Sequence, residues 1–164
     1  MSLPSTALEA GRDPVTAYIA LGANLGEARA TVRHAIAALG ACPGIKLRLT
    51  SSLYRTAPME SSGPDYINAV VEVETELSAP ALLAQLQALE QANGRGRPYR
   101  NAPRTLDLDI LLFGEARLES AALSIPHPRM AGRAFVLVPL AEIAPHRVRP
   151  AQLQAVREQA IERL

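Results

Sequence analysis

One run of the chain, Arg104 to Phe113, constrains the fold more than any other stretch. It is almost wholly apolar apart from two carboxylates, Asp107 and Asp109. The apolar tail that starts at Ile110 indicates a central strand of a sheet. Because side chains alternate between the two faces of a strand, both carboxylates lie on one face. The side chains expected on the other face are Leu106, Leu108, Ile110 and Leu112.

Two like charges side by side on a half-buried strand are costly unless a cation neutralises them. Magnesium fits, because it binds through one or two carboxylates and completes its shell with water and phosphate oxygens. A solvated strand edge with two surface acids is the alternative. Guanidinium groups grip phosphate oxygens, and a basic loop just before the carboxylates favours a polyphosphate site. The arginines of that loop are Arg95, Arg97, Arg100 and Arg104.

The periodicity of apolar residues gives the order of the elements. It predicts strands over residues 15–21, 45–54, 66–77 and 104–113, and helices over 27–39 and from 78 to about 94. This order predicts an α+β fold, a ferredoxin-like βαββαβ antiparallel sheet with two helices on one face. Helices over 135–143 and 152–164 are expected as C-terminal additions. The other face of the sheet is expected to stay free and to carry Tyr66, Asn68, Asp107 and Asp109, if their strands are neighbours.

The bulk composition restricts the classes of partner. A chain of 164 residues is expected to form one domain, over residues 15–164, after a disordered N-terminal extension of residues 1–14. The net charge of +1 gives no global attraction to nucleic acid or membranes, so any anion site is built locally. The single Cys42 rules out an internal disulfide. No apolar run approaches the roughly 20 residues that span a bilayer. We expect a cytoplasmic monomer with small-molecule substrates.

Two further motifs could contact a ligand, and each has a structural alternative. The glycine-rich turn from Gly22 to Gly26 could present backbone amides to phosphate, although tight-turn chemistry alone also explains it. Tyr66 and Asn68 are two residues apart and share a strand face. They could stack on a flat heterocycle and read its edge, with Phe135 as a second aromatic plate. The alternative is a surface Tyr and Asn on an exposed sheet.

His127 lies between two prolines, with Arg129 and Arg133 close in the sequence. The imidazole could donate a hydrogen bond to phosphate, and the two arginines favour that interpretation. A purely structural histidine is the alternative. His34 and His146 have no such neighbours, and we expect both at the surface.

Together these motifs resemble the 6-hydroxymethyl-7,8-dihydropterin pyrophosphokinase family over about residues 15–145. The most specific part of the resemblance is the run from Pro103 to Gly114. Supporting matches stand in order at residues 20–26, 52–56, 65–69, 126–127 and 133–135. Two departures are Asn101-Ala102, where many members have an aromatic residue and a glycine, and Pro128, where some have a tyrosine. We expect retained activity with altered affinities.

The resemblance implies transfer of a pyrophosphoryl group from ATP to the hydroxymethyl group of the pterin, with release of AMP. By carry-over from the family, Asp107 and Asp109 would hold two Mg²⁺ ions and, with Arg97 and Arg104, would be catalytic. The residues carried over to the nucleotide are Glu90, Arg95, Arg97, Arg104, His127 and Arg133. Those carried over to the pterin are Thr56, Ala57, Met59, Tyr66, Asn68 and Phe135.

Two rival functions fit parts of the pattern. A ferredoxin-like module that binds RNA or a small ligand without catalysis would use the open sheet as its platform. The two acids expected there would repel a nucleic-acid backbone. A metal-dependent nucleotidyltransferase would use the same carboxylates but attack the α-phosphate and release pyrophosphate. A regulatory homologue with an inactive site is disfavoured, because the carboxylates and arginines are all present.

Overall fold

The computed structural model describes residues 13–58, 63–95 and 106–164. The strands of the main sheet are β1 (Val15–Ala23), β2 (Ile45–Thr50), β3 (Tyr54–Thr56), β4 (Tyr66–Thr75), β5 (Asp107–Phe113) and β8 (Glu162–Arg163). A separate hairpin pairs β6 (Leu118–Glu119) with β7 (Ser124–Ile125). The α-helices are α2 (Ala28–Ala41), α3 (Ala79–Glu90), α4 (Ala134–Ile143) and α5 (Pro150–Ala155). Short turns of π- or 3₁₀-helix cover Gln91–Arg95, Met130–Gly132 and Pro145–Arg147.

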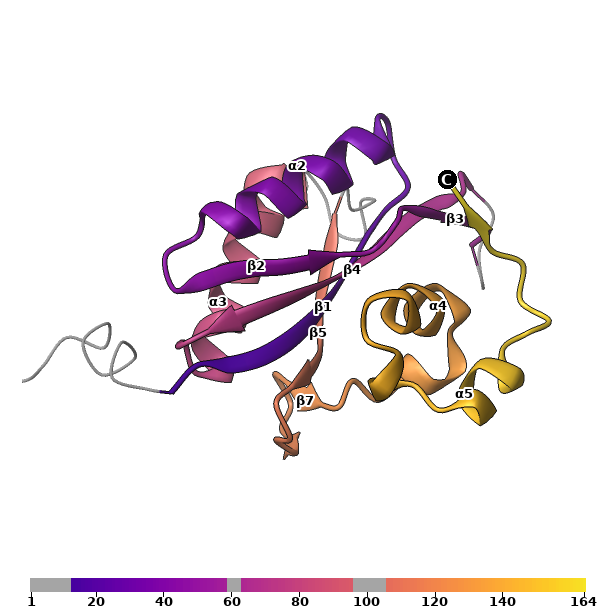
Figure 1. The fold of residues 1–164 in the computed structure, drawn as a ribbon. Helices are drawn as coiled ribbons and strands as arrows, with labels where there is room; N and C mark the ends of the chain where they lie inside the picture. The colour runs from indigo at the N-terminus through magenta and orange to yellow at the C-terminus, as the bar shows by residue number, and fades with distance from the viewer. Residues whose placement is uncertain (1–12, 59–62, 96–105) are drawn as a thin grey trace, which may run out of the picture.

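The main sheet is antiparallel, with β1 between β5 and β4. The strand with the two aspartates, expected to be central, is therefore an edge strand of this sheet, and its apolar residues are buried by the two cores. The other edge of β4 pairs with β2 and then with β3, and β8 adds to β3. The helices α2 and α3 lie together on one face of this sheet (Figure 1). The predicted α+β fold of ferredoxin-like type is therefore confirmed.

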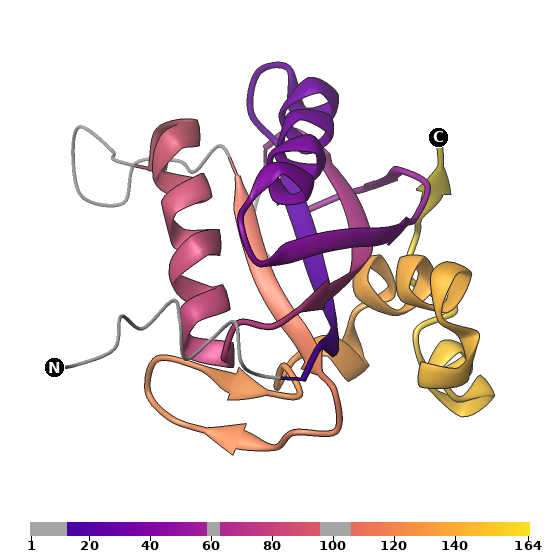
Figure 2. The same ribbon diagram turned by 60° about the vertical axis from the view of Figure 1, so that its left-hand side comes forward.

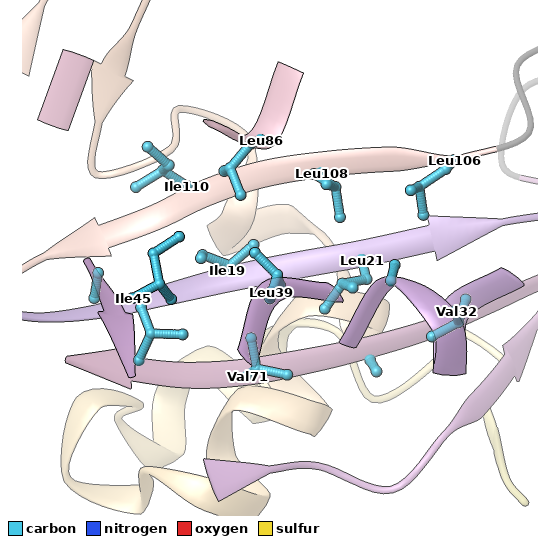
Figure 3. Close-up of a cluster of buried hydrophobic side chains, with 14 of the residues drawn as sticks. Ile19, Leu21, Val32, Leu39, Ile45, Val71, Leu86, Leu106, Leu108 and Ile110 are labelled. Carbon is cyan, nitrogen blue, oxygen red and sulfur yellow. The ribbon is translucent and has the colours of Figure 1, made fainter. Parts of the chain in front are cut away.

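The larger hydrophobic core lies between the sheet and the helices α2 and α3 (Figure 3). Alternate strand residues enter it, among them Ile19 and Leu21 of β1 and Val71 of β4. Leu39 of α2 and Leu86 of α3 close the core from the helix side. Because alternate residues of β5 also enter this core, the two aspartates between them face the other side of the sheet.

The second face of the sheet is only partly open, which corrects the expectation that it stays free. A second core covers part of it, around Val70 of β4, Leu111 of β5 and Leu137 of α4. Figures 1 and 2 show α4 and α5 on the side of the sheet away from α2 and α3. The C-terminal additions thus turn the uncovered part of this face into a walled pocket instead of a flat platform.

One predicted side-chain direction is wrong. The sequence pattern puts Leu112 on the same face as Leu108, but Leu112 belongs to the second core. The pairing of β1 with β5 shifts between Tyr18 and Ile19, whose partners are Leu112 and Ile110. One residue of β5 is therefore extra in the ladder, and such a bulge sends the next side chain to the other face.

The predicted helix over 152–164 is wrong over most of its length. Helix α5 ends at Ala155, and the chain continues through a turn to β8. Val156 is buried in the second core, and β8 pairs with β3. The unpaired edge of β3 offers backbone hydrogen-bonding groups, and the end of the chain satisfies them by forming a strand. The strand expected over 45–54 likewise divides, since β2 ends at Thr50 and β3 starts at Tyr54, whereas the helix expected over 135–143 is confirmed as α4.

Candidate active site

A pocket of about 690 Å³ lies over the ends of β1, β4 and β5 and is bordered by residues of the segment 127–136. This is the uncovered part of the second sheet face. Residues far apart in the sequence meet here. The predicted site residues that line the pocket are Thr56, Ala57, Tyr66, Asn68, Asp107, Asp109, His127, Arg133 and Phe135.

Asp107 and Asn68 lie in one row across the sheet, and Asp109 lies two residues further along β5. Their strands are not neighbours, because β1 runs between them. Gly22 of β1 is the register partner of Asp107 on one side and of Asn68 on the other. Ala20, two residues back, is paired with Asp109. Two small residues therefore form the floor between the acidic side and the amide side of the pocket.

Gly22 has the further property that a side chain would not fit easily. A Cβ atom at this position would lie 3.2 Å from Oδ1 of Asn68. The sequence suggested a phosphate-binding turn from Gly22, but this residue lies inside β1, which continues to Ala23. A space-making role for Gly22 was therefore missed. The signal for it was the pair of small residues, Ala20 and Gly22, that follow Tyr18 on one face of the strand.

The wall on the β4 side carries a fixed amide. The Asn68 side chain is 4% exposed, and its Nδ2 donates a hydrogen bond of 2.8 Å to Oγ1 of Thr56. Thr56 is the register partner of Tyr66, which is half-buried at the start of β4. The hydrogen bond holds Asn68 in one orientation, so its carbonyl oxygen presents an acceptor beside the floor of the pocket.

A second wall combines a cation with an aromatic ring. Cζ of Arg133 lies 5.3 Å from the ring centroid of Phe135, within the range of a cation–π contact. Both residues line the pocket, Arg133 just before α4 and Phe135 in its first turn. Tyr66 lines the same pocket from β4, so it contains two aromatic rings from different elements.

His127 occupies the rim of the pocket near the carboxylates. Its backbone N–H donates to the carbonyl oxygen of Leu111, and its Nδ1 accepts a hydrogen bond of 3.1 Å from the backbone N–H of Arg129. Burial, opposed by the charge of Asp109 and aided by Arg133 and Arg129, lowers the pKa of His127 from 6.5. The imidazole is therefore neutral at pH 7, with its proton on Nε2 as a donor.

A second, smaller pocket of about 230 Å³ lies on the outer side of β5. It shares Asp109, His127 and Pro128 with the first pocket. Its remaining lining is mostly apolar or small and comes from α3, β5, the loop before β7 and the first residue of β7: Leu83, Leu108, Ile110, Ser120, Ala121, Ala122, Leu123 and Ser124. A ligand with two ends could therefore lie across β5, with its middle at Asp109 and His127.

Glu90, which was expected on the nucleotide side, lines neither of these pockets. Its side chain is 5% exposed, and Oε2 accepts a hydrogen bond of 2.9 Å from the backbone N–H of Leu108. Leu108 stands between the two aspartates of β5. The contact supports the strand that carries them.

Several predicted residues lie outside the described part of the chain. Met59, Arg97 and Arg104 belong to the ranges 59–62 and 96–105. The same holds for the side chain of Arg95, which ends the π-helical turn after α3.

The donor set of the site fits a divalent cation of the magnesium type. Within residues 13–58, 63–95 and 106–164, no group of three or more His, Cys, Asp or Glu side chains could hold a metal ion. The carboxylates of Asp107 and Asp109 face one pocket side by side. Two carboxylates suffice for Mg²⁺ when phosphate oxygens and water supply the other ligands. The same set would be too small for a structural metal held by protein alone.

Comparison with known proteins gives a consistent family. Residues 18–145 match the family model described as 7,8-dihydro-6-hydroxymethylpterin-pyrophosphokinase (HPPK). A 2-amino-4-hydroxy-6-hydroxymethyldihydropteridine pyrophosphokinase of Synechocystis sp. is 48% identical over 134 residues, which are 82% of this chain and 69% of the relative. The enzyme of the same name from Pseudomonas aeruginosa is 44% identical over 154 residues, 90% of this chain and 95% of the relative.

Solved structures share the fold at much lower identity. A crystal structure of an HPPK-DHPS in complex with substrates matches with a TM-score of 0.67 and 15% identity, over 88% of this chain and 43% of that chain. A Plasmodium falciparum HPPK-DHPS matches with a TM-score of 0.64 and 14% identity, over 82% of this chain. This chain spans 42% of the length of that protein. At this identity the likeness shows the fold alone.

Proposed function

Because the chain belongs to the 7,8-dihydro-6-hydroxymethylpterin-pyrophosphokinase family, we propose that it transfers the pyrophosphoryl group of ATP to 6-hydroxymethyl-7,8-dihydropterin. The products are AMP and the pterin pyrophosphate, an intermediate of folate biosynthesis. The observation that carries the proposal is one pocket that contains both an aromatic, amide-lined half and a pair of carboxylates. The rival of a binding module without catalysis is not favoured.

The half of the pocket between β4 and α4 suits the pterin. Tyr66 and Phe135 provide aromatic faces on which a flat bicyclic ring can stack. The Asn68 amide, held by Thr56, can hydrogen-bond the edge of the ring. Ala57, exposed beside Thr56, and Met59, outside the described residues, would flank that edge. The small residues of β1 leave space between the ring and the carboxylates, which is where the hydroxymethyl group must reach.

The nucleotide would lie across β5. The smaller pocket has apolar side chains for a base, among them Leu83, Ile110 and Leu123. From there the triphosphate would run past Asp109 and His127, which belong to both pockets. The neutral His127 would donate a hydrogen bond from Nε2 to a phosphate oxygen.

The chemistry joins the hydroxymethyl oxygen to the β-phosphorus and breaks the bond from this phosphorus to the oxygen that leaves with AMP. Asp107 and Asp109 would hold Mg²⁺, as two ions by analogy with the family, and the bound metal would supply charge neutralisation at the phosphates and a lower pKa for the attacking hydroxyl, whose proton would pass to solvent. Arg133 would add positive charge at the pocket, and Arg97 and Arg104 would approach from outside the described residues. Catalysis is then mainly positioning and electrostatic stabilisation.

The cellular setting adds further proposals. No helix in the described part of the chain combines the length and apolarity needed to cross a bilayer. A cytoplasmic location and a monomeric state stay predictions from the sequence. The division into an extension over 1–14 and one domain over 15–164 also stays a prediction, and residues 1–12 lie outside the described part.

The reaction is tested by product analysis with ATP, Mg²⁺ and 6-hydroxymethyl-7,8-dihydropterin. We expect one AMP for each pterin pyrophosphate, with ATP labelled at the γ-phosphate delivering its label to the pterin. A nucleotidyltransferase would instead release pyrophosphate and attach the nucleotide to the acceptor. Free pyrophosphate, or ATP left intact by folded protein, would contradict the proposal.

A further inference from the structure

A side chain near the C-terminus bridges the wall that carries Arg133 and Phe135. Oε1 of Gln159 accepts a hydrogen bond of 2.9 Å from the backbone N–H of Ala134. Nε2 of the same amide donates a bond of 2.9 Å to the carbonyl oxygen of Gly132. The two backbone groups flank Arg133 on either side. One side chain therefore fixes the backbone directly before and after this arginine.

The contact with Ala134 also supplies a missing helix cap. The first N–H groups of a helix have no partner within the helix and need an acceptor from elsewhere. The N-cap residue of α4 is Arg133, whose side chain forms no capping hydrogen bond. Gln159 provides the acceptor from 25 residues further along the chain. The start of α4, and with it the direction of Phe135 in the first turn, depends on this remote amide.

The segment that carries Gln159 is itself held at both ends. On one side Val156 is 3% exposed within the second core. On the other side β8 pairs with β3, and the backbone N–H of Leu164 donates to the carbonyl oxygen of Leu53 at 2.9 Å. β3 ends at Thr56, which holds Asn68. The C-terminal segment thus contacts elements that form both walls of the pocket.

We propose that Gln159 is a positioning residue for the heterocycle, acting through the backbone of Gly132 and Ala134 on the wall formed by Arg133 and Phe135. It lies beyond residues 18–145, the range that matches the family model. The inference rests on the proposed function, because the ligand of that wall is taken to be the pterin.

The test is steady-state kinetics of the full chain with ATP and 6-hydroxymethyl-7,8-dihydropterin. Gln159→Ala is expected to raise the KM for the pterin roughly threefold to tenfold, the effect of losing one or two ordinary hydrogen bonds. The KM for ATP is expected to change less. Gln154→Ala is the matched control, because Gln154 is exposed on α5, and both its KM values should equal those of the wild type.

A double-mutant cycle separates positioning from a general loss of stability. If Gln159 acts through Phe135, then Gln159→Ala adds less than about twofold to the pterin KM of Phe135→Ala. Full additivity, or an unchanged pterin KM in Gln159→Ala, would overturn the inference. Should Gln159→Ala fail to fold, Gln159→Glu keeps the acceptor for Ala134 and loses the donor to Gly132. Its pterin KM should then lie above that of the wild type, and equality would count against the inference.

The two proposals fail in different ways. A wild-type chain that forms no pterin pyrophosphate would refute the proposed function and remove the premise of the inference. A wild-type chain that turns over, with a Gln159→Ala variant of identical pterin KM, would refute the inference alone.

Discussion

Gly22 of β1 keeps open the space between the two halves of the pocket. Gly22 stands between Asp107 and Asn68 in the sheet, so any side chain there would occupy the space between the two halves of the site. The Asn68 amide cannot easily yield, because it is buried and hydrogen-bonded to Thr56. The glycine is therefore needed for space, at a place where its backbone is ordinary strand.

Gly22→Ala should reduce the free energy of pterin binding more than the free energy of unfolding. The added Cβ would meet Oδ1 of Asn68 at 3.2 Å and disturb the acceptor that reads the ring edge. We expect a loss of about 1 kcal/mol, or about fivefold in the dissociation constant of the pterin, measured by equilibrium titration.

Gly40→Ala is the matched control for this substitution. Its Cβ would make ordinary contacts of 3.6 Å with Leu47, and Gly40 lies inside α2, where alanine is favoured by about 0.5–1 kcal/mol. It should leave pterin binding unchanged. Equal pterin affinities for Gly22→Ala and Gly40→Ala would contradict the role given to Gly22.

At the scale of elements, Glu142 of α4 connects the helix to the break between β2 and β3. Its carboxylate accepts hydrogen bonds from the Ser52 backbone at 3.0 Å, from the Ser52 hydroxyl at 2.9 Å and from the Tyr54 hydroxyl at 2.7 Å. The guanidinium nitrogen Nη2 of Arg163 in β8 lies 3.4 Å from Oε2 of Glu142. Burial raises the pKa of Glu142. The hydrogen bonds from Tyr54 and Ser52 and the charge of Arg163 outweigh burial, so this pKa lies below its ordinary value of 4.5.

Glu142→Ala should lower the free energy of unfolding by about 1–2 kcal/mol at neutral pH, from the lost charge-assisted hydrogen bonds. Because the folded pKa of Glu142 is lowered, its contribution is present above the unfolded pKa and is lost as the pH falls through the folded pKa. The difference between wild type and variant should therefore shrink on acidification. Urea unfolding over a series of pH values measures it.

The control for this prediction is Glu158→Ala, which removes an exposed pair with Arg157 that contributes little. It should cost less than about 0.5 kcal/mol at every pH. A Glu142→Ala variant as stable as this control at pH 7, or a difference that grows on acidification, would contradict the assignment.

The same elements show what the sequence could and could not predict. Period-two patterns identified β1, β4 and β5 and the face that holds Asp107 and Asp109, because burial on one face enforces alternation. The bulge in β5 was not predictable, since it depends on the register with β1. The pairing of β8 with β3 is also long-range. The short apolar pattern around Val156 is equally compatible with a helix. Gln159 was missed because its hydrogen-bond partners are backbone groups 25 and 27 residues away in the sequence.

In the molecule as a whole, the two faces of the main sheet have different roles. The core against α2 and α3 fixes the strand register, while the core against α4 leaves one end of the other face uncovered. The two pockets meet there at β5, around Asp109 and His127. Bringing the reacting groups of two substrates together is the main source of catalysis when the protein contributes position and charge. The proposed catalysis therefore depends above all on the two carboxylates of β5.

The most direct test is the turnover of Asp107→Asn and Asp109→Asn with saturating ATP and pterin in Mg²⁺. Both variants should fold like the wild type, since Asp107 and Asp109 line the pocket and do not belong to either core. Their kcat should fall by about 10²- to 10³-fold, comparable to the loss of one preorganised electrostatic contact. Glu119→Gln, exposed on β6, should leave kcat unchanged. Wild-type turnover in either aspartate variant would contradict the account.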